Sequence, residues 1–169
     1  MGGITMSVNS PSFYGGCNAT ALDRTIQSGP FGNGIMFEQK PVINGGQIIA
    51  FSFSHMVYNY SFLLTDIDSG LDDNGIYGWS DRIVLVTPMS YTYTLPTGSS
   101  VIGNGTSVEP FRNSNDFNQG SSSSGGNIFI SIPGPLMSFT IDFSSAMRGG
   151  SSTQRITMGN LAFKDCGES

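Results

Sequence analysis

The sequence predicts an all-β protein: an antiparallel β-sandwich of the jelly-roll or carbohydrate-binding-module type, built as one domain over residues 1–169. Three observations support this fold class. Short segments of alternating apolar and polar residues recur along the chain, turn-forming residues separate them at the spacing of a sandwich, and no segment has a convincing helical period. The twelve Phe and six Tyr are sufficient to fill a sandwich interior.

The predicted strands follow an irregular N-terminal segment, residues 1–34, in which Gly and Pro interrupt any regular element except for one short helix at most. The clearest alternation lies in residues 47–54, where Ile49, Phe51 and Phe53 share one face. The other predicted strands are residues 35–38, 58–64, 82–86, 91–95, 101–105, 127–132, 137–143 and 154–164.

Two of these strands carry more detailed expectations. Residues 82–86 are expected to be buried throughout, and residues 137–143 to turn Met137, Phe139, Ile141 and Phe143 inward. Residues 109–127 have no period and are expected to form a long exposed loop.

A crowded acidic stretch, residues 65–81, lies between two predicted strands. It contains five of the twelve acidic residues and the only tryptophan; the five are Asp66, Asp68, Asp72, Asp73 and Asp81. Carboxylates this close repel one another unless a cation, hydrogen bonds or water compensates, and Ca²⁺ suits a flexible loop of oxygen ligands.

The spacing of these residues is not that of an EF-hand. With Gly75 at the sixth position of the loop, the first position falls on Gly70, which has no carboxylate, and the flanking segments are strands. We therefore predict a structural calcium site of a different kind, with a solvated acidic loop as the alternative.

The aromatic residues of this stretch, Tyr77 and Trp79, are candidates for ligand binding. In a polar, Gly-rich loop they are placed to stack on a sugar ring or to anchor a protein partner. The alternative is that Trp79 packs down as the lid of the core. Arg82 is expected to pair with a nearby carboxylate.

Composition and motifs argue against several classes of function. A net charge of −5 disfavours nucleic acid and anionic membranes, and no apolar run approaches the ~20 residues that cross a bilayer. A single histidine, His55, stands in no catalytic motif, and no zinc or nucleotide motif is present. Glycoside hydrolysis needs a substrate-lined cleft around two carboxylates, and one tryptophan is little to line it. We predict that the chain is not an enzyme.

The two cysteines, Cys17 and Cys166, lie near opposite ends of the chain. A disulfide between them would close a long loop, and it agrees with an extracellular setting, which the low lysine content also favours. The alternative is two unrelated buried thiols.

Four short motifs carry a resemblance to a known class of proteins. They are Phe62-Leu63-Leu64-Thr65-Asp66-Ile67-Asp68, Trp79-Ser80-Asp81-Arg82-Ile83-Val84, Pro110-Phe111-Arg112-Asn113-Ser114-Asn115, and Ile156-Thr157-Met158-Gly159-Asn160-Leu161-Ala162-Phe163-Lys164-Asp165-Cys166. From about residue 46 the chain resembles β-sandwich modules of large secreted or cell-wall-anchored bacterial proteins, including fibrillar adhesins.

The resemblance implies a lectin-like, non-catalytic module at the cell surface that binds a glycan or an extracellular host protein. A structural subunit of a surface appendage, assembled from copies of the chain, is the alternative. In that case the N-terminal segment would reach a neighbouring subunit. A glycan-active enzyme is the third and weakest hypothesis.

Overall fold

The computed structural model describes residues 3–9, 12–20, 23–29, 32–71, 77–114, 123–146 and 153–165. Within them the chain forms β-strands and one short 3₁₀ helix. The elements are β1 (Met6–Val8), β2 (Ser12–Tyr14), β3 (Asn18–Ala19), β4 (Ile26–Gly29), β5 (Gly32–Lys40), β6 (Gly46–Thr65), β7 (Ser69–Leu71), β8 (Tyr77–Val86), β9 (Thr92–Thr94), β10 (Val101–Ile102), β11 (Arg112–Asn113), η1 (Ser124–Gly126), β12 (Ile128–Ile132), β13 (Leu136–Ser145) and β14 (Gln154–Asp165). No helix among these residues is long and apolar enough to cross a membrane.

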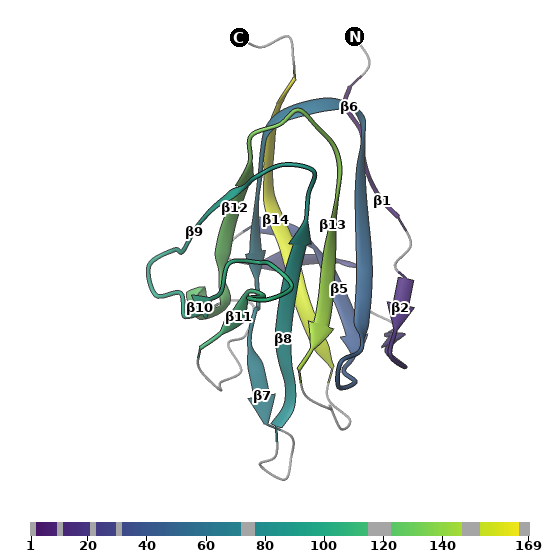
Figure 1. Cartoon of the computed structure of the whole chain (residues 1–169), viewed down its shortest axis with the longest axis vertical. Helices are drawn as coiled ribbons and strands as arrows, with labels where there is room; N and C mark the ends of the chain where they lie inside the picture. Colours follow the sequence, from purple (N-terminus) through teal and green to yellow (C-terminus); the bar gives the residue numbers. More distant parts are fainter. Residues whose placement is uncertain are drawn as a thin grey trace.

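The strands form two antiparallel layers that share β6 (Figure 1). In the front sheet, the first half of β6 pairs with β1 and β2 on one side and with β13 on the other, and β8 and β7 follow. In the rear sheet, the second half of β6 pairs with β12 and β14, and β9, β5, β3 and β4 complete the layer. The predicted all-β, antiparallel fold is confirmed.

The strand β6 passes from one sheet to the other at a corner near Asn59. Before the corner the odd-numbered residues face the core, as at Phe51 and Phe53, whereas after it the even-numbered ones do, as at Tyr60 and Phe62. Asn59 has φ of +50°, a conformation that Asn tolerates better than most residues. The extra residue at the corner shifts the alternation by one, so two predicted strands are one continuous strand of 20 residues.

Aromatic rings fill the space between the two sheets. The rings of Phe51 and Phe139 stack with centroids 4.5 Å apart, and the ring of Tyr60 meets that of Phe53 edge-on at 5.0 Å. The contact of Tyr60 with Phe53 joins the rear sheet to the front sheet close to the corner of β6, whereas Phe51 and Phe139 lie side by side within the front sheet. Apolar burial there is the main source of stability in such a fold.

Four sequence-based expectations differ from the structure. Residues 109–127 are not exposed throughout, because Phe111 is 0% exposed and exchanges backbone hydrogen bonds with Ile83, and the stretch includes β11 and η1. Residues 1–34 are less irregular than predicted, because they contain the start of β5 and the strands β1 to β4, each of which is too short to show a period. Met137 is 44% exposed, because an irregularity between Leu136 and Ser138 breaks the alternation and buries Leu136 instead. Residues 82–86 alternate, with Val86 57% exposed, because β8 has the core on one face only.

Candidate functional site

The described part of the acidic stretch includes β7 and the start of β8, which lie at the bottom of Figure 1. β6 leaves the rear sheet at Thr65, residues 66–68 cross to the front sheet, and β7 then pairs with β8. The backbone N–H of Asp81 donates to the carbonyl oxygen of Asp68 at 2.9 Å. This crossing brings Asp66 and Asp68 close to Asp81, and we call these three residues the carboxylate end.

The three carboxylates are buried: Asp66, Asp68 and Asp81 are 5%, 4% and 0% exposed. The two side-chain oxygens of Asp81 accept hydrogen bonds, one from the backbone N–H of Asp68 at 2.8 Å and one from Nε2 of Gln154 at 2.7 Å. Oδ1 of Asp68 accepts from Nε1 of Trp79 at 2.8 Å. Asp68 and Asp81 are therefore built into the structure by specific donors.

Burial and mutual repulsion change the acidity of this group. Burial raises the pKa of Asp66 to about 7, the neighbouring charge of Asp68 adds to the rise, and Arg155 opposes it. Burial also raises the pKa of Asp81 well above its ordinary value, with a further contribution from Asp68. Neither Asp66 nor Asp81 takes part in the ion pairs of the described residues, which join Arg24 to Asp23 and Arg155 to Glu38.

The carboxylate end continues inward as a polar layer between the two sheets. Gln154 on β14 donates to Asp81 on β8, and its Oε1 accepts from Nε2 of Gln39 on β5 at 2.7 Å. Nε2 of Gln39 also reaches the carbonyl oxygen of Phe143 on β13 at 3.3 Å. All three side chains are 0% exposed, so this layer closes the apolar core with buried hydrogen bonds, although Oε1 of Gln39 has no hydrogen-bond partner among the described residues.

Trp79 lies on the core-facing side of β8, the side that also carries Asp81 and Ile83, and its side chain is half-buried. Its indole covers Gly70, the residue opposite it on β7: a Cβ added to Gly70 would lie 2.2 Å from Cη2 of the indole. The indole is thus fixed by Gly70 on one face and by Asp68 at its nitrogen. This geometry agrees with Trp79 as a lid of the core, and it leaves part of the ring accessible.

The other predicted site residues divide between described and undescribed parts of the chain. Asp72 and Asp73 lie outside the described residues, and β8 includes the backbone of Tyr77 but its side chain is not described. Within the described ranges, no group of three or more His, Cys, Asp or Glu side chains could hold a metal ion. Because Asp81 and Asp68 already accept hydrogen bonds from the protein, the described carboxylates do not fit a calcium site by themselves.

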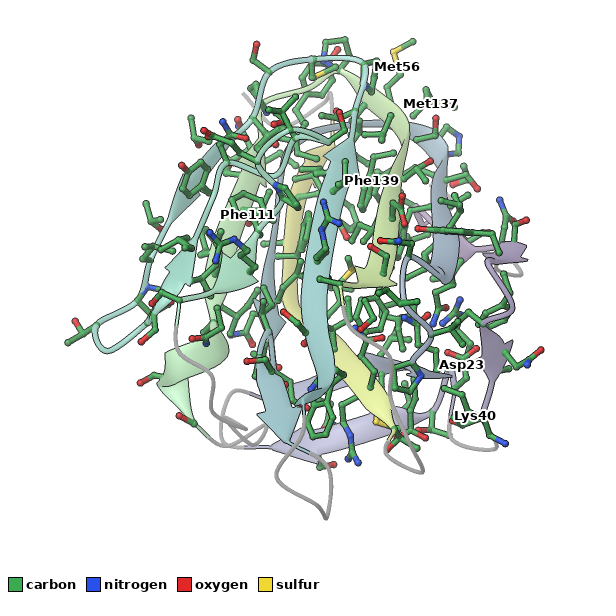
Figure 2. All side chains as sticks on the ribbon, turned by 60° about the horizontal axis from the view of Figure 1, so that its bottom comes forward. Asp23, Lys40, Met56, Phe111, Met137 and Phe139 are labelled. Atoms are coloured by element: carbon green, nitrogen blue, oxygen red, sulfur yellow. The ribbon has the colours of Figure 1, made fainter. Side chains whose placement is uncertain are left out.

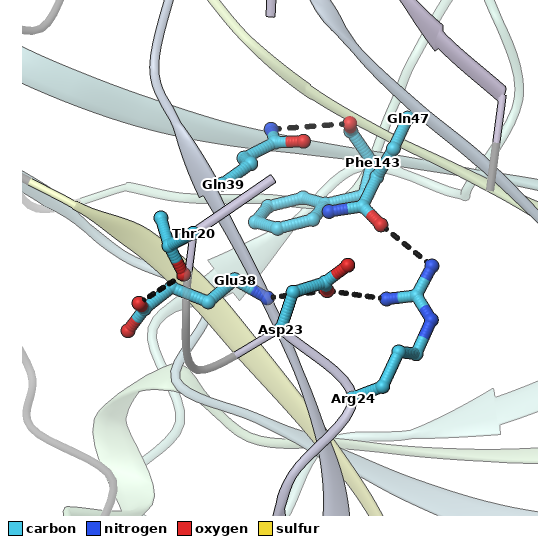
Figure 3. Close-up of polar contacts among 7 residues, drawn as sticks. All are labelled: Thr20, Asp23, Arg24, Glu38, Gln39, Gln47 and Phe143. Atoms are coloured by element: carbon cyan, nitrogen blue, oxygen red, sulfur yellow. Dashed lines mark hydrogen bonds and ion pairs between the residues drawn. The ribbon is translucent and has the colours of Figure 1, made fainter. Parts of the chain in front are cut away.

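A second buried polar cluster, which the sequence did not indicate, lies beside the same end of the sandwich (Figure 3). Arg24 donates to Oδ1 of Asp23 at 2.6 Å and to Oε1 of Gln47 at 2.8 Å, and its guanidinium lies 4.5 Å from the centroid of the Phe37 ring. Oδ1 of Asp23 also accepts from the backbone N–H of Glu38 at 3.1 Å. These contacts hold Asp23 and Arg24 against β5 and β6.

Cys17 is a buried free thiol in the structure. Its Sγ donates to the carbonyl oxygen of Lys40 at 3.2 Å, and burial raises its pKa to about 11. Cys166 lies outside the described residues. The structure gives no support to the predicted disulfide, which stays a prediction.

Comparison with known proteins gives one match. No protein-family model matches the chain, and no curated protein matches it. Among solved structures, the chain is similar to a family 11 carbohydrate-binding module from Clostridium thermocellum, in complex with a β-1,3-1,4-mixed-linked tetrasaccharide. The match covers 92% of this chain and 88% of that chain at 13% identity, with a TM-score of 0.25. A likeness at this level identifies no ligand and no binding surface here.

Proposed function

We propose that this chain is a non-catalytic, extracellular binding module, an adhesin-like domain whose ligand is a glycan that stacks on Trp79. The observation that carries the proposal is the fixed, partly accessible indole at the carboxylate end, held by Asp68 and packed on Gly70. A ring that is already immobilised loses little conformational entropy on binding, and its apolar face suits the C–H face of a sugar.

The absence of catalysis is part of the same proposal. Asp81 is 0% exposed and both of its oxygens accept hydrogen bonds, so it is poorly placed to attack or protonate a substrate. A bound polysaccharide is expected to be recovered intact, with no new reducing ends after long incubation. Release of reducing sugar by the parent would contradict this part of the proposal.

The binding test uses the single tryptophan as its own reporter, because tryptophan emission, excited selectively above the tyrosine absorption, comes from position 79 alone. Soluble uncharged, acidic and amino-sugar polysaccharides are titrated while emission is followed, and calorimetry gives the affinity. We expect one class to shift the emission and Trp79→Ala to weaken that binding by about tenfold, which is ~1.4 kcal/mol. Phe163→Leu, at the opposite end of the sandwich, serves as the control and should bind like the parent.

A host protein is the other ligand that the same surface would suit. If calorimetry detects binding of an extracellular-matrix protein and of no polysaccharide, and if Trp79→Ala weakens that calorimetric affinity, the module binds protein. Unchanged affinity of Trp79→Ala for every ligand would remove Trp79 from the site.

The calcium site stays a prediction from the sequence, dependent on Asp72 and Asp73 together with Asp66. Asp66 is the best candidate among the described carboxylates, because it is buried and belongs to none of the described ion pairs. A bound cation would hold the acidic loop beside Trp79, which is a structural and not a catalytic role.

A structural subunit remains the second candidate function, and exposed apolar side chains around the corner of β6 favour it. Met56, Met137, Leu161 and Phe163 are 51%, 44%, 41% and 40% exposed. Figure 2 places Met56 and Met137 together, far from Asp23 and Lys40. Light scattering at increasing concentration tests this function: growth of assemblies that Met137→Ser abolishes would support it, and a constant monomer mass would count against it.

A further inference from the structure

We propose a second carbohydrate-binding surface on the outward face of the front sheet, where Tyr14, Arg82 and Asp142 bind an uncharged glycan by hydrogen bonds. It rests on the proposed function for the class of ligand, but it uses none of the residues of the carboxylate end. Below, these three residues are called the front-sheet triad.

Strand register places the triad on one face. Tyr14 is opposite Gly46, Gly46 is opposite Ser144, and Ser144 is opposite Arg82, so these residues form one row across four strands. The next outward row contains Ser12, Ile48, Asp142 and Val84. Between the rows, Gln47, Phe143 and Ile83 point into the core and are buried, which fixes the opposite direction for the triad.

This face of the sheet is accessible. The side chains of Tyr14, Arg82 and Asp142 are all partly exposed, as are Ile48 and Val84 between them. In Figure 1, β8 and β13 pass in front of β14 and turn this face toward the viewer. A row of four strands measures about 14 Å, which accommodates more than one sugar ring.

Hydrogen bonding holds the phenol and the carboxylate in place. The hydroxyl of Tyr14 donates to Oδ1 of Asp142 at 2.6 Å. Burial raises the pKa of Tyr14 to about 12, with Asp142 adding to the rise, so the phenol stays neutral at physiological pH. Because Tyr14 engages one oxygen, Asp142 presents its other oxygen in a fixed direction, and such preorganisation reduces the cost of binding.

Arg82 and Asp142 supply complementary charged groups, of which Asp142 has one oxygen engaged by Tyr14. The ion pairs in the described part of the chain involve neither residue, although Arg82 was expected to pair with a carboxylate. A sugar hydroxyl can donate to a carboxylate and accept from a guanidinium, so vicinal hydroxyls can satisfy both groups together. The aliphatic side chains of Ile48 and Val84, in the row of Asp142, give the C–H edge of a ring an apolar contact.

The balance of charge selects an uncharged ligand. The triad contains one positive and one negative group, so its net charge is zero, while the whole chain carries −5. An acidic polysaccharide would be repelled by Asp142 and by the overall charge, and a basic one would find no excess of carboxylate on this face. We therefore commit to neutral polysaccharides, and acidic ones serve as the negative probe.

The test compares near-isosteric variants of the triad with variants of Trp79. Calorimetric titration with soluble uncharged polysaccharides is carried out on the parent, Arg82→Gln, Asp142→Asn, Tyr14→Phe and Trp79→Ala. We expect Arg82→Gln and Asp142→Asn to weaken binding by five- to tenfold with unfolding temperatures close to that of the parent, and Tyr14→Phe to have a smaller effect. Arg112→Gln, an exposed arginine on β11, is the matched control and should bind normally.

The outcomes separate this surface from the proposed contact at Trp79. Loss of binding in the triad variants with normal binding by Trp79→Ala supports the front-sheet surface and counts against Trp79. Loss only in Trp79→Ala overturns the front-sheet surface and leaves the proposed function standing. Binding of acidic polysaccharides alone, or of no polysaccharide, overturns the surface.

A second measurement keeps the test independent of any loss of folding. The side-chain Nε–Hε resonances of the arginines are recorded in the parent by NMR during titration with the same uncharged polysaccharide. We expect the Arg82 resonance, assigned with Arg82→Gln, to move on binding while that of Arg112 stays in place. A stationary Arg82 resonance at saturation would overturn the proposal.

Discussion

At the scale of single residues, the burial of Asp66 has a measurable cost. Its pKa in the folded chain, about 7, lies above the ordinary value of 3.8, so folding favours its protonated form. The stability associated with Asp66 is therefore fully present below about pH 4 and is lost as pH rises through 7. In chelator, Asp66→Asn should raise the free energy of unfolding by about 4 kcal/mol at pH 8, with the gain vanishing near pH 4.

Urea unfolding of parent and variant across this pH range measures the effect. Asn suits the φ of +69° at this position, so the substitution introduces no new backbone strain. Glu109→Gln, at an exposed carboxylate, is the matched control for the loss of one negative charge. A difference between Asp66→Asn and parent that is equal at pH 8 and pH 4 would contradict the assigned pKa.

A second prediction at the scale of single residues concerns Gly70. A methyl group there would lie 2.2 Å from the indole of Trp79, so Gly70→Ala must displace the ring and weaken its bond to Asp68. We expect a loss of about 1–3 kcal/mol in unfolding free energy and a red shift of tryptophan emission. Gly3→Ala, where nothing lies within 4 Å of the added carbon, should leave both unchanged.

Sequence reasoning found the charged residues of the carboxylate end but not their partners. The crowding of Asp66, Asp68 and Asp81 is visible as a local run, and their closeness in space follows from a short crossing between strands. Gln154, which satisfies Asp81, is 73 positions away along the chain, and no local pattern indicates that pair. For the same reason Asp23 and Arg24, which bind across strands, gave no signal.

At the scale of elements, the corner of β6 depends on one residue. Asn59 holds a positive φ where the strand changes sheets, and a β-branched side chain is strained in that conformation. Asn59→Val should lower the free energy of unfolding by about 1–2 kcal/mol, whereas Asn59→Gly should cost much less. Denaturant unfolding measures both, and Ser61→Val, two positions later in the same strand, is expected to be nearly neutral. Equal stability of Asn59→Val and parent would show that the corner is not set by this residue.

At the scale of elements, the alternation of apolar and polar residues identifies some strands and not others. The segments 47–54 and 137–143 were found because each has one face on the core over several residues. The strands β1 to β4 were missed because each is two to four residues long and pairs only at an edge, so its sequence carries no alternation long enough to recognise. The sequence does not reveal the corner of β6, because the alternation of buried and exposed residues shifts there by one position. Two separate strands joined by a turn would produce the same pattern.

At the scale of the whole molecule, the two sheets are joined by an apolar core near the corner of β6 and by hydrogen-bonded polar side chains at the carboxylate end. The apolar part tolerates changes in pH, whereas the polar part contains Asp66 and Asp81, whose pKa values burial raises, so that their ionised forms destabilise the folded chain. The stability of the chain should therefore be limited by the carboxylate end at neutral and alkaline pH.

A bound calcium ion would remove that limit, because it favours the ionised form of the carboxylates that contact it. Calcium at a hundred times its dissociation constant adds about 2.7 kcal/mol to the free energy of unfolding, which raises the unfolding temperature of a domain of this size by about 5–10 °C. We expect this increase in the parent at pH 8 and its loss in Asp66→Asn, while Glu109→Gln retains it. If calcium and chelator give the same unfolding temperature in all three proteins, the acidic stretch is a solvated loop and the calcium prediction is wrong.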